Sequence, residues 1–136
     1  MDKLKQAYIT HTTDNYEQIT INLVNSISSF SDKPIVVYTI DYTATEALKS
    51  IATCIRLDLE LPKLSGDDFL GDGIKYVNRS TYRTYKALSS KIDCMLHACD
   101  FIEEWVYLDG DCIANYNVDD LFDWCASADE YPLATK

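Results

Sequence analysis

Apolar residues along this chain fall into blocks whose spacing changes between that of strands and that of helices. Residues 6–10 predict a short strand, and the hydroxyls and acid of residues 12–15 predict its exit and a helix cap. A helix should follow, because Ile19, Leu23, Ile27 and Phe30 recur at helical spacing before the break at residues 31–34. The uncharged residues 35–40 predict a second strand, covered on both faces.

Beyond residue 40 the apolar residues again alternate between helical and strand spacing. Thr43 and Glu46 have the spacing of a capping box, which predicts a short helix through Ile51. Residues 54–61 alternate as in a half-exposed strand, and the glycine-rich residues 62–80 predict a long loop. A helix is predicted from Thr81, then a strand at residues 105–108, an extended segment at 112–114 and a helix from Asn117. The apolar face of the helix from Thr81 is expected to hold Tyr82, Tyr85, Leu88 or Ser89, Ile92, Leu96 and Cys99.

This order of elements predicts an α/β fold with a mainly parallel sheet flanked by helices. At 136 residues the chain fits a single domain. Ligands of such sheets bind beyond the carboxyl ends of the strands. Three polar segments, at residues 10–16, 41–42 and 109–111, are therefore expected to meet at one edge.

Charge and cysteine content narrow the functional classes. A formal charge of −10 argues against a nucleic-acid partner, which needs clustered Lys and Arg. Half of the 22 acidic residues lie between Ile92 and Thr135, where there is no Lys or Arg, so a cation is expected to offset part of this charge. The alternative, a solvated acidic surface, accounts for most of these carboxylates. The five cysteines are odd in number, without C-x-x-C spacing, and predict mainly buried, reduced thiols. Because neither a signal peptide nor a membrane span is visible, we expect a soluble cytoplasmic protein.

The strongest chemical signal is Asp109-Gly110-Asp111, directly after the strand predicted at residues 105–108. In an extended chain the side chains at i and i+2 point the same way, so both carboxylates should converge on one hard cation. Gly110 should let a ligand approach the backbone. The sequence therefore predicts a metal-assisted phosphate site.

A hydrophobic strand ending in D-x-D resembles the metal-binding motif of GT-A fold glycosyltransferases. Residues 6–16 resemble the opening strand and nucleotide loop of the glycogenin-like, family 8 type, and residues 90–95 resemble its helix that presents a lysine to the diphosphate. Residues 109–113 and 118–122 resemble its metal strand and following helix. The resemblance implies that residues 1–136 form one Rossmann-like, GT-A nucleotide-binding half.

The resemblance also implies roles for individual residues. Asp111 would bind Mn²⁺ or Mg²⁺, Asp109 would bind the metal, the ribose or both, and Lys91 would act as a point charge on the diphosphate. For Lys91, a solvated helix lysine is the alternative. The donor-binding residues would be Thr10, His11, Thr12, Thr13, Tyr16, Lys91, Asp109 and Gly110.

Within the predicted nucleotide loop, the threonines would hydrogen-bond a base or ribose and Tyr16 would stack on the base. The alternative is helix capping by Thr13 or Asp14, with Tyr16 as a packing residue. His11 stands where the family usually has an apolar residue, so the resemblance leaves the role of its side chain open.

The predicted function is therefore metal-dependent transfer of a sugar from a nucleoside diphosphate sugar, with a uridine diphosphate sugar expected, to a glycan, lipid or protein acceptor. The alternative is a noncatalytic nucleotide-sugar or partner-binding module. The family's acceptor-binding half and the late histidine of its metal shell have no counterpart, so we expect a domain truncated at its C-terminus. Aromatic residues left uncovered there would favour a homo-oligomer.

Overall fold

The computed structural model describes residues 2–60 and 79–127, with only the backbone at 79–88 and 125–127. Its strands are β1 (Leu4–Thr12), β2 (Ile35–Ile40), β3 (Thr53–Leu57) and β4 (Ile102–Tyr107). Its helices are a short 3-10 turn η1 (Asp14–Tyr16), α1 (Glu17–Ser28), α2 (Glu46–Lys49), α3 (Arg79–Phe101) and α4 (Asp120–Ser127).

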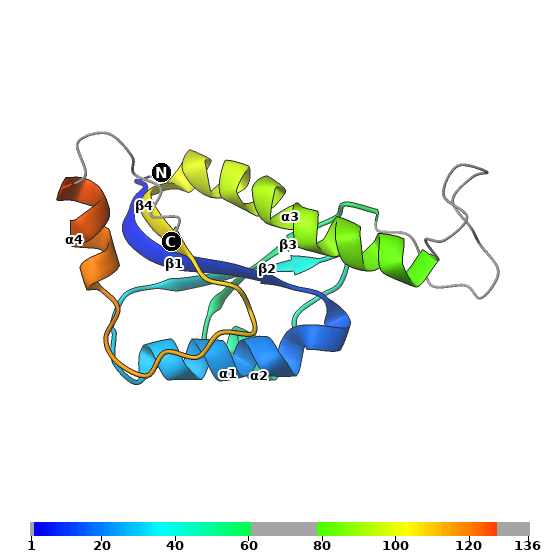
Figure 1. The fold of residues 1–136 in the computed structure, drawn as a ribbon, viewed down its shortest axis with the longest axis horizontal. Helices are drawn as coiled ribbons and strands as arrows, with labels where there is room; N and C mark the ends of the chain where they lie inside the picture. The colour runs from blue at the N-terminus through cyan, green and yellow to red at the C-terminus, as the bar shows by residue number, and fades with distance from the viewer. Residues whose placement is uncertain (1, 61–78, 128–136) are drawn as a thin grey trace.

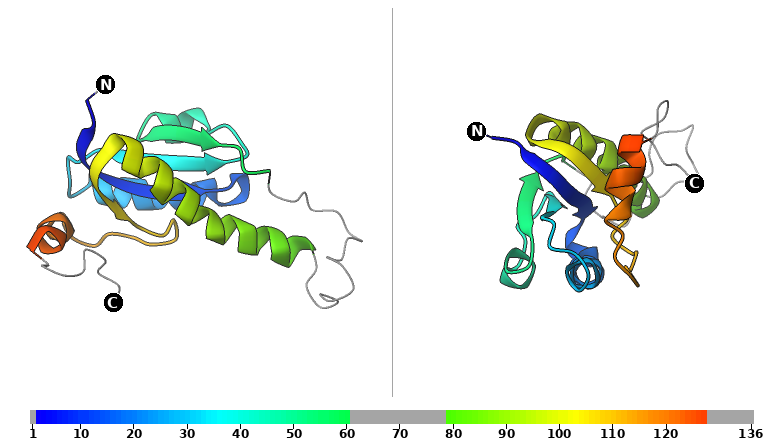
Figure 2. Two further views of the ribbon diagram at one scale, coloured as in Figure 1. Left: turned by 90° about the horizontal axis from the view of Figure 1, so that it is seen from above. Right: turned by 90° about the vertical axis from the view of Figure 1, so that its left-hand side faces the viewer.

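The four strands form one sheet in the order β3-β2-β1-β4, and every neighbouring pair is parallel. Helices α1 and α2 lie on one face of the sheet and α3 lies on the other (Figure 1). The views in Figure 2 show the same layers from above and from the side. The predicted α/β class with a parallel, helix-flanked sheet is confirmed, and the arrangement is Rossmann-like.

Alternate residues of β1 and β2 build a core on each face of the sheet. Tyr8 and Val37 face α1 and α2, where they pack with Leu23, Val24 and Leu48. On the other face, a second cluster holds Ala7, Ile9, Val36, Tyr38, Cys94 and Ala98. All six residues of β2 are buried, as its uncharged sequence predicted.

Two predicted helix faces are rotated from those that the structure buries. In α1, the sheet covers Thr20, Leu23, Val24 and Ile27, while Ile19 is 43% exposed. In α3, the buried face carries the small residues Ser90, Cys94 and Ala98, whereas Ile92, Leu96 and Cys99 of the predicted stripe are exposed. The side chains of Tyr82, Tyr85 and Leu88 lie outside the described part of the structure. Small side chains let the helix backbone approach the sheet closely, which leaves larger neighbours facing outward.

Several element ends also differ from prediction. The N-cap of α2 is Thr45, not Thr43, and its Oγ1 accepts a hydrogen bond from Leu48 N at 3.5 Å. Strand β3 stops at Leu57, because the Asp41 carboxylate takes the next free amides, Leu59 N at 2.6 Å and Glu60 N at 3.0 Å. The predicted loop at 62–80 lies outside the described residues, except that residues 79–80 already belong to α3.

The prediction of mainly buried cysteines is only partly correct. Cys94 is buried and Cys54 is half-buried, but Cys99 and Cys112 are exposed, and all four are free thiols. Cys99 lies on the outward face of α3 and Cys112 follows the D-G-D segment, so neither contributes to the core. The side chain of Cys125 is outside the described part of the chain.

Candidate functional site

The sheet has a topological switch point between β1 and β4. The chain adds β2 and then β3 on one side of β1, and it crosses back to place β4 on the other side. In open parallel sheets, the crevice beyond the carboxyl ends of the two strands at such a point is the usual ligand site. Thr10, near the end of β1, and Asp109, which follows β4, both lie at this edge of the sheet.

The D-G-D segment forms a turn and not an extended strand end. Strand β4 ends at Tyr107, and Leu108 N donates to Ile9 O at 3.0 Å. Cys112 N donates to Asp109 O at 3.0 Å, which closes a tight turn around Gly110 and Asp111. The argument that i and i+2 side chains point the same way is therefore wrong for this pair. The predicted extended segment at 112–114 is likewise irregular chain.

Gly110 lies against the body of the domain. A Cβ placed on it would lie 2.9 Å from Thr20 Oγ1, 3.3 Å from His11 O and 3.8 Å from Thr10 Oγ1. The space beside Gly110 on that side is thus filled by β1 and α1. Its small size lets the turn pack closely against β1 and α1, a role that the sequence did not suggest.

Lys91 and Asp109 are brought together from α3 and the end of β4. Lys91 Nζ lies 4.0 Å from Asp109 Oδ1, with the side chains 43% and 59% exposed. The same ammonium lies 6.0 Å from the centre of the Tyr107 ring. A long, solvent-exposed ion pair contributes little to stability, so Lys91 is available to a stronger anion.

Tyr107 and His11 form a contact that the sequence did not suggest. The Tyr107 hydroxyl lies 2.6 Å from His11 Nδ1, and the rings are stacked with centroids 5.9 Å apart. Burial, and then the nearby Asp109 carboxylate, raises the pKa of Tyr107 above its ordinary value, so the hydroxyl keeps its proton. His11 therefore belongs to the same cluster as Lys91 and Asp109.

The threonines at the end of β1 are less accessible than predicted. Thr10, Thr12 and Thr13 are all buried, at 2%, 3% and 4% exposure. Thr12 Oγ1 donates to Thr13 O at 3.0 Å. Thr10 Oγ1 is buried without a hydrogen-bond partner among the described residues. Thus Thr10 offers an unused donor and acceptor next to the Gly110 turn, while Thr12 and Thr13 face the interior.

The structure tests the alternative in which Thr13 caps a helix and Tyr16 packs in the core. Thr13 is the N-cap of η1, but its side chain makes no capping hydrogen bond. Tyr16 is 56% exposed and so is not a core packing residue. Its ring is free to meet solvent or a flat ligand at the carboxyl edge of the sheet.

Sequence reasoning missed a buried carboxylate at the start of α1. Glu17 is 6% exposed and accepts hydrogen bonds from Thr45 Oγ1 and, at 3.3 Å, from Thr45 N. Burial alone would raise the pKa of Glu17, but the hydrogen bonds from the Thr45 hydroxyl and amide outweigh it and lower the pKa. Because its partners lie 28 residues away, no local pattern could reveal this bridge between α1 and α2.

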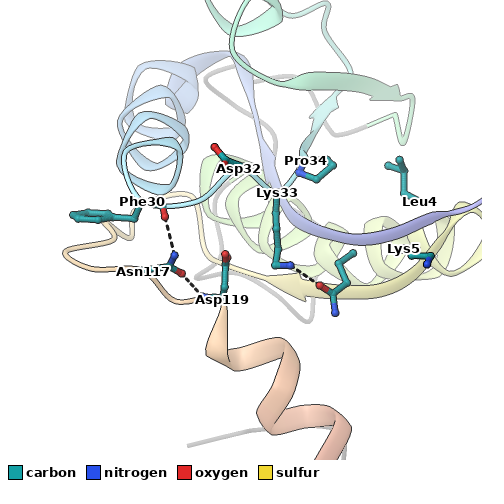
Figure 3. A pocket seen from close by; sticks show the side chains of 9 residues that line it. Leu4, Lys5, Phe30, Asp32, Lys33, Pro34, Asn117 and Asp119 are labelled. Atoms are coloured by element: carbon teal, nitrogen blue, oxygen red, sulfur yellow. Dashed lines mark hydrogen bonds between the residues drawn. The ribbon is translucent and has the colours of Figure 1, made fainter.

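A depression of about 500 Å³ lies at the opposite edge of the sheet, near the start of β1 (Figure 3). Its polar groups already bond one another: Lys33 Nζ donates to Gln6 Oε1 at 2.5 Å and Asn117 Nδ2 to Phe30 O at 2.7 Å. Asp119, also lining it, accepts from Tyr8 Oη at 2.6 Å. These bonds join β1, the 30–34 loop and the segment before α4, so we treat this region as structural.

Within residues 2–60 and 79–127, no three His, Cys, Asp or Glu side chains are grouped so that they could hold a metal ion. Among the helices of the same residues, none combines the length and apolar composition needed to cross a bilayer. No protein-family model matches the chain, and a search of curated proteins found no match either.

Proposed function

We propose that this chain binds a nucleoside diphosphate sugar together with Mn²⁺ or Mg²⁺, as the donor-binding part of a glycosyltransferase of GT-A type. The observation that carries the proposal is the position of Asp109 and Asp111 at the switch point, with Lys91 Nζ 4.0 Å from Asp109. An acidic turn next to one lysine suits a ligand that brings both an anion and its counter-cation.

The side chains at this edge of the sheet suit both the divalent cation and the diphosphate. Carboxylate oxygens of Asp109 and Asp111 are the hard ligands that Mg²⁺ and Mn²⁺ prefer, and both residues are exposed. The bound cation would neutralise the charge that develops on the departing diphosphate. Two protein carboxylates leave other coordination positions to phosphate oxygens and water. Lys91 would exchange its weak ion pair for the diphosphate.

The accessibility of Tyr16 and of the threonines decides which of them could contact the donor. The exposed ring of Tyr16 is the natural stacking partner for the base. Thr10 Oγ1 has no hydrogen-bond partner among the described residues, but it is buried beside the Gly110 turn, so it would reach the donor only if that turn moved. Thr12 and Thr13 would act indirectly, by holding the backbone of the loop. A uridine diphosphate sugar and a glycan, lipid or protein acceptor are proposed on the sequence resemblance alone.

The second candidate function is a noncatalytic nucleotide-sugar-binding module. It is favoured by the two-carboxylate donor set, since the described residues supply no third metal ligand. Binding without turnover would distinguish it from the enzyme. Slow release of free sugar from the donor, abolished by Asp109→Asn, would support the enzyme.

Isothermal titration calorimetry tests the donor site. We expect uridine or guanosine diphosphate sugars to bind in Mn²⁺ and to lose at least about tenfold in affinity in excess chelator, a change of about 1.4 kcal/mol. Asp111→Asn and Lys91→Gln should cause similar losses. Asp123→Asn, an exposed aspartate on α4, is the matched control and should bind as the parent does.

The proposal fails if no donor binds in the presence of either metal while the protein is folded by circular dichroism. It also fails if Asp111→Asn and Asp123→Asn bind equally well, because the metal would then not lie at the turn.

A further inference from the structure

His11 and Tyr107 face helix α3 from two neighbouring strands, at the carboxyl edge of the sheet. Tyr107 of β4 is paired with Ile9 of β1, so these two side chains lie on the same face. Ile9 belongs to the core cluster under α3, and Tyr107 packs against that cluster. His11, two residues after Ile9 in the same strand, points to the same side. The two residues therefore lie between the sheet and α3 where the strands end.

Lys91 lies on the side of α3 that faces the sheet. Cys94 and Ala98 follow it by three and seven residues and are fully buried, and positions i, i+3 and i+7 share one face of a helix. The Lys91 side chain is thus directed toward the end of the sheet. Its Nζ lies 6.0 Å from the centre of the Tyr107 ring and 4.0 Å from Asp109 Oδ1.

The Tyr107 ring can hold this ammonium without neutralising it. The face of an aromatic ring attracts a cation but carries no net charge, so the lysine keeps its full charge for an anion. The Asp109 carboxylate is less suitable, because it repels an approaching phosphate and would bind the metal in the proposed site. Once Asp109 holds a metal ion, the ring is the contact that keeps Lys91 in place.

His11 supplies the contact that fixes the Tyr107 ring. His11 Nδ1 lies 2.6 Å from the Tyr107 hydroxyl, and the two rings stack with centroids 5.9 Å apart and an interplanar angle of 29°. A hydrogen bond at the tip of the tyrosine and a second ring along its side together restrict the rotation of Tyr107. The ring thereby links a strand of the sheet to the lysine of the helix.

We propose that His11 and Tyr107 are positioning residues for Lys91, which hold its ammonium beside the D-G-D turn where it can meet a phosphate oxygen. The role toward phosphate rests on the proposed function, whereas the position of the ammonium does not. Neither His11 nor Tyr107 has to touch the donor to fulfil this role.

Reductive ¹³C-methylation of the lysines, followed by NMR, tests the position of the ammonium. Methylation keeps the positive charge, and methyl protons over an aromatic ring shift upfield. We expect the Lys91 signal, assigned with Lys91→Arg, to lie upfield of the signal of the exposed Lys5. Lys33 is an internal reference, because its Nζ lies 5.1 Å from the centre of the Phe122 ring, near the opposite edge of the sheet.

Two substitutions of His11 separate its contact with Tyr107 from general packing. His11→Leu removes the polar contact, so the Lys91 signal should lose its upfield shift. His11→Asn keeps a side chain that can donate or accept a hydrogen bond, and it should restore the shift. His97→Leu is the matched control, because His97 Nδ1 lies 3.1 Å from the Tyr38 hydroxyl, also between α3 and the sheet. This variant should leave the Lys91 signal unchanged.

Calorimetric titration with uridine and guanosine diphosphates in Mn²⁺ gives the second readout. For the nucleotide that the parent binds, His11→Leu should weaken affinity about two- to fivefold, as expected for losing one cation–π contact at an exposed site. His11→Asn should recover most of this loss. Circular dichroism checks that each variant is folded.

The proposal is overturned if the Lys91 signal of the parent is not upfield or if His11→Leu leaves it unchanged. An equal change in His11→Leu and His97→Leu also overturns it, since α3 as a whole would then have moved. A shifted signal with unchanged affinity overturns the role toward phosphate. If the parent binds neither nucleotide, the proposed function fails, while the methyl signals still decide whether the pair positions Lys91.

Discussion

Replacing Gly110 by alanine tests how the turn after β4 is held against β1 and α1. The added Cβ would lie 2.9 Å from Thr20 Oγ1 and 3.3 Å from His11 O. Thr20 is 1% exposed, so its side chain has little room to move aside. We expect Gly110→Ala to lower the free energy of unfolding by about 1–3 kcal/mol, the usual cost of forcing an extra carbon into a packed interior.

The closest atom can be removed, which makes the explanation testable. Thr20→Ala deletes Oγ1 and leaves the contact with His11 O as the one tight contact, which a shift of a few tenths of an ångström relieves; the contact with Thr10 Oγ1 at 3.8 Å is an ordinary one. By itself Thr20→Ala should cost about 1 kcal/mol, because the hydroxyl donates a long bond, 3.3 Å, to Tyr16 O. In the Thr20→Ala background, Gly110→Ala should be nearly neutral, so the coupling between the two positions should be about 1 kcal/mol or more.

Urea unfolding followed by circular dichroism gives the four free energies of this cycle. The reasoning is refuted if Gly110→Ala costs less than about 0.5 kcal/mol, the range of an ordinary surface substitution. It is also refuted if Gly110→Ala costs the same with and without Thr20 Oγ1. The double variant, once shown to be folded, also allows donor titrations that separate the packing of the turn from its role in binding.

Two further predictions concern the core and the edge opposite the turn. Cys94 is fully buried, and burial raises the pKa of its thiol to about 12, so alkylation of the native protein should modify Cys99 and spare Cys94 until urea unfolds the chain. Peptide mass spectrometry measures this, and equal labelling of both would contradict the packing of α3. Burial alone would raise the pKa of Asp119, but hydrogen bonds from Tyr8 and Ser31, with the charge of Lys33, lower it below its ordinary value. A carboxyl whose pKa is lowered by folding stabilises the protein above the pKa of the unfolded chain, and this stabilisation is lost as the pH falls through the folded value. Asp119→Asn should therefore lose stability relative to the parent above about pH 4 and approach it in stronger acid, as measured by thermal unfolding at several pH values. A difference that does not change with pH would contradict the lowered pKa.

The alternation of strands and helices was predictable because each element has its own local pattern. Residues 35–40 are uncharged and become the fully buried β2 at the predicted bounds. Helix faces were harder to predict, since α3 has two possible apolar faces. The one built from Ser90, Cys94 and Ala98 is less hydrophobic, but it allows closer contact with the sheet.

In the candidate site too, features set by neighbouring residues were predictable, whereas contacts between residues far apart in the sequence were not. The acidic pair and its place after a strand were visible in the sequence, as was the lysine of the preceding helix. The turn closed by Cys112 N was not predicted, because D-G-D suits either an extended chain or a turn. The contact between Tyr107 and His11 joins residues 96 apart, so only the pairing of β1 with β4 brings it about.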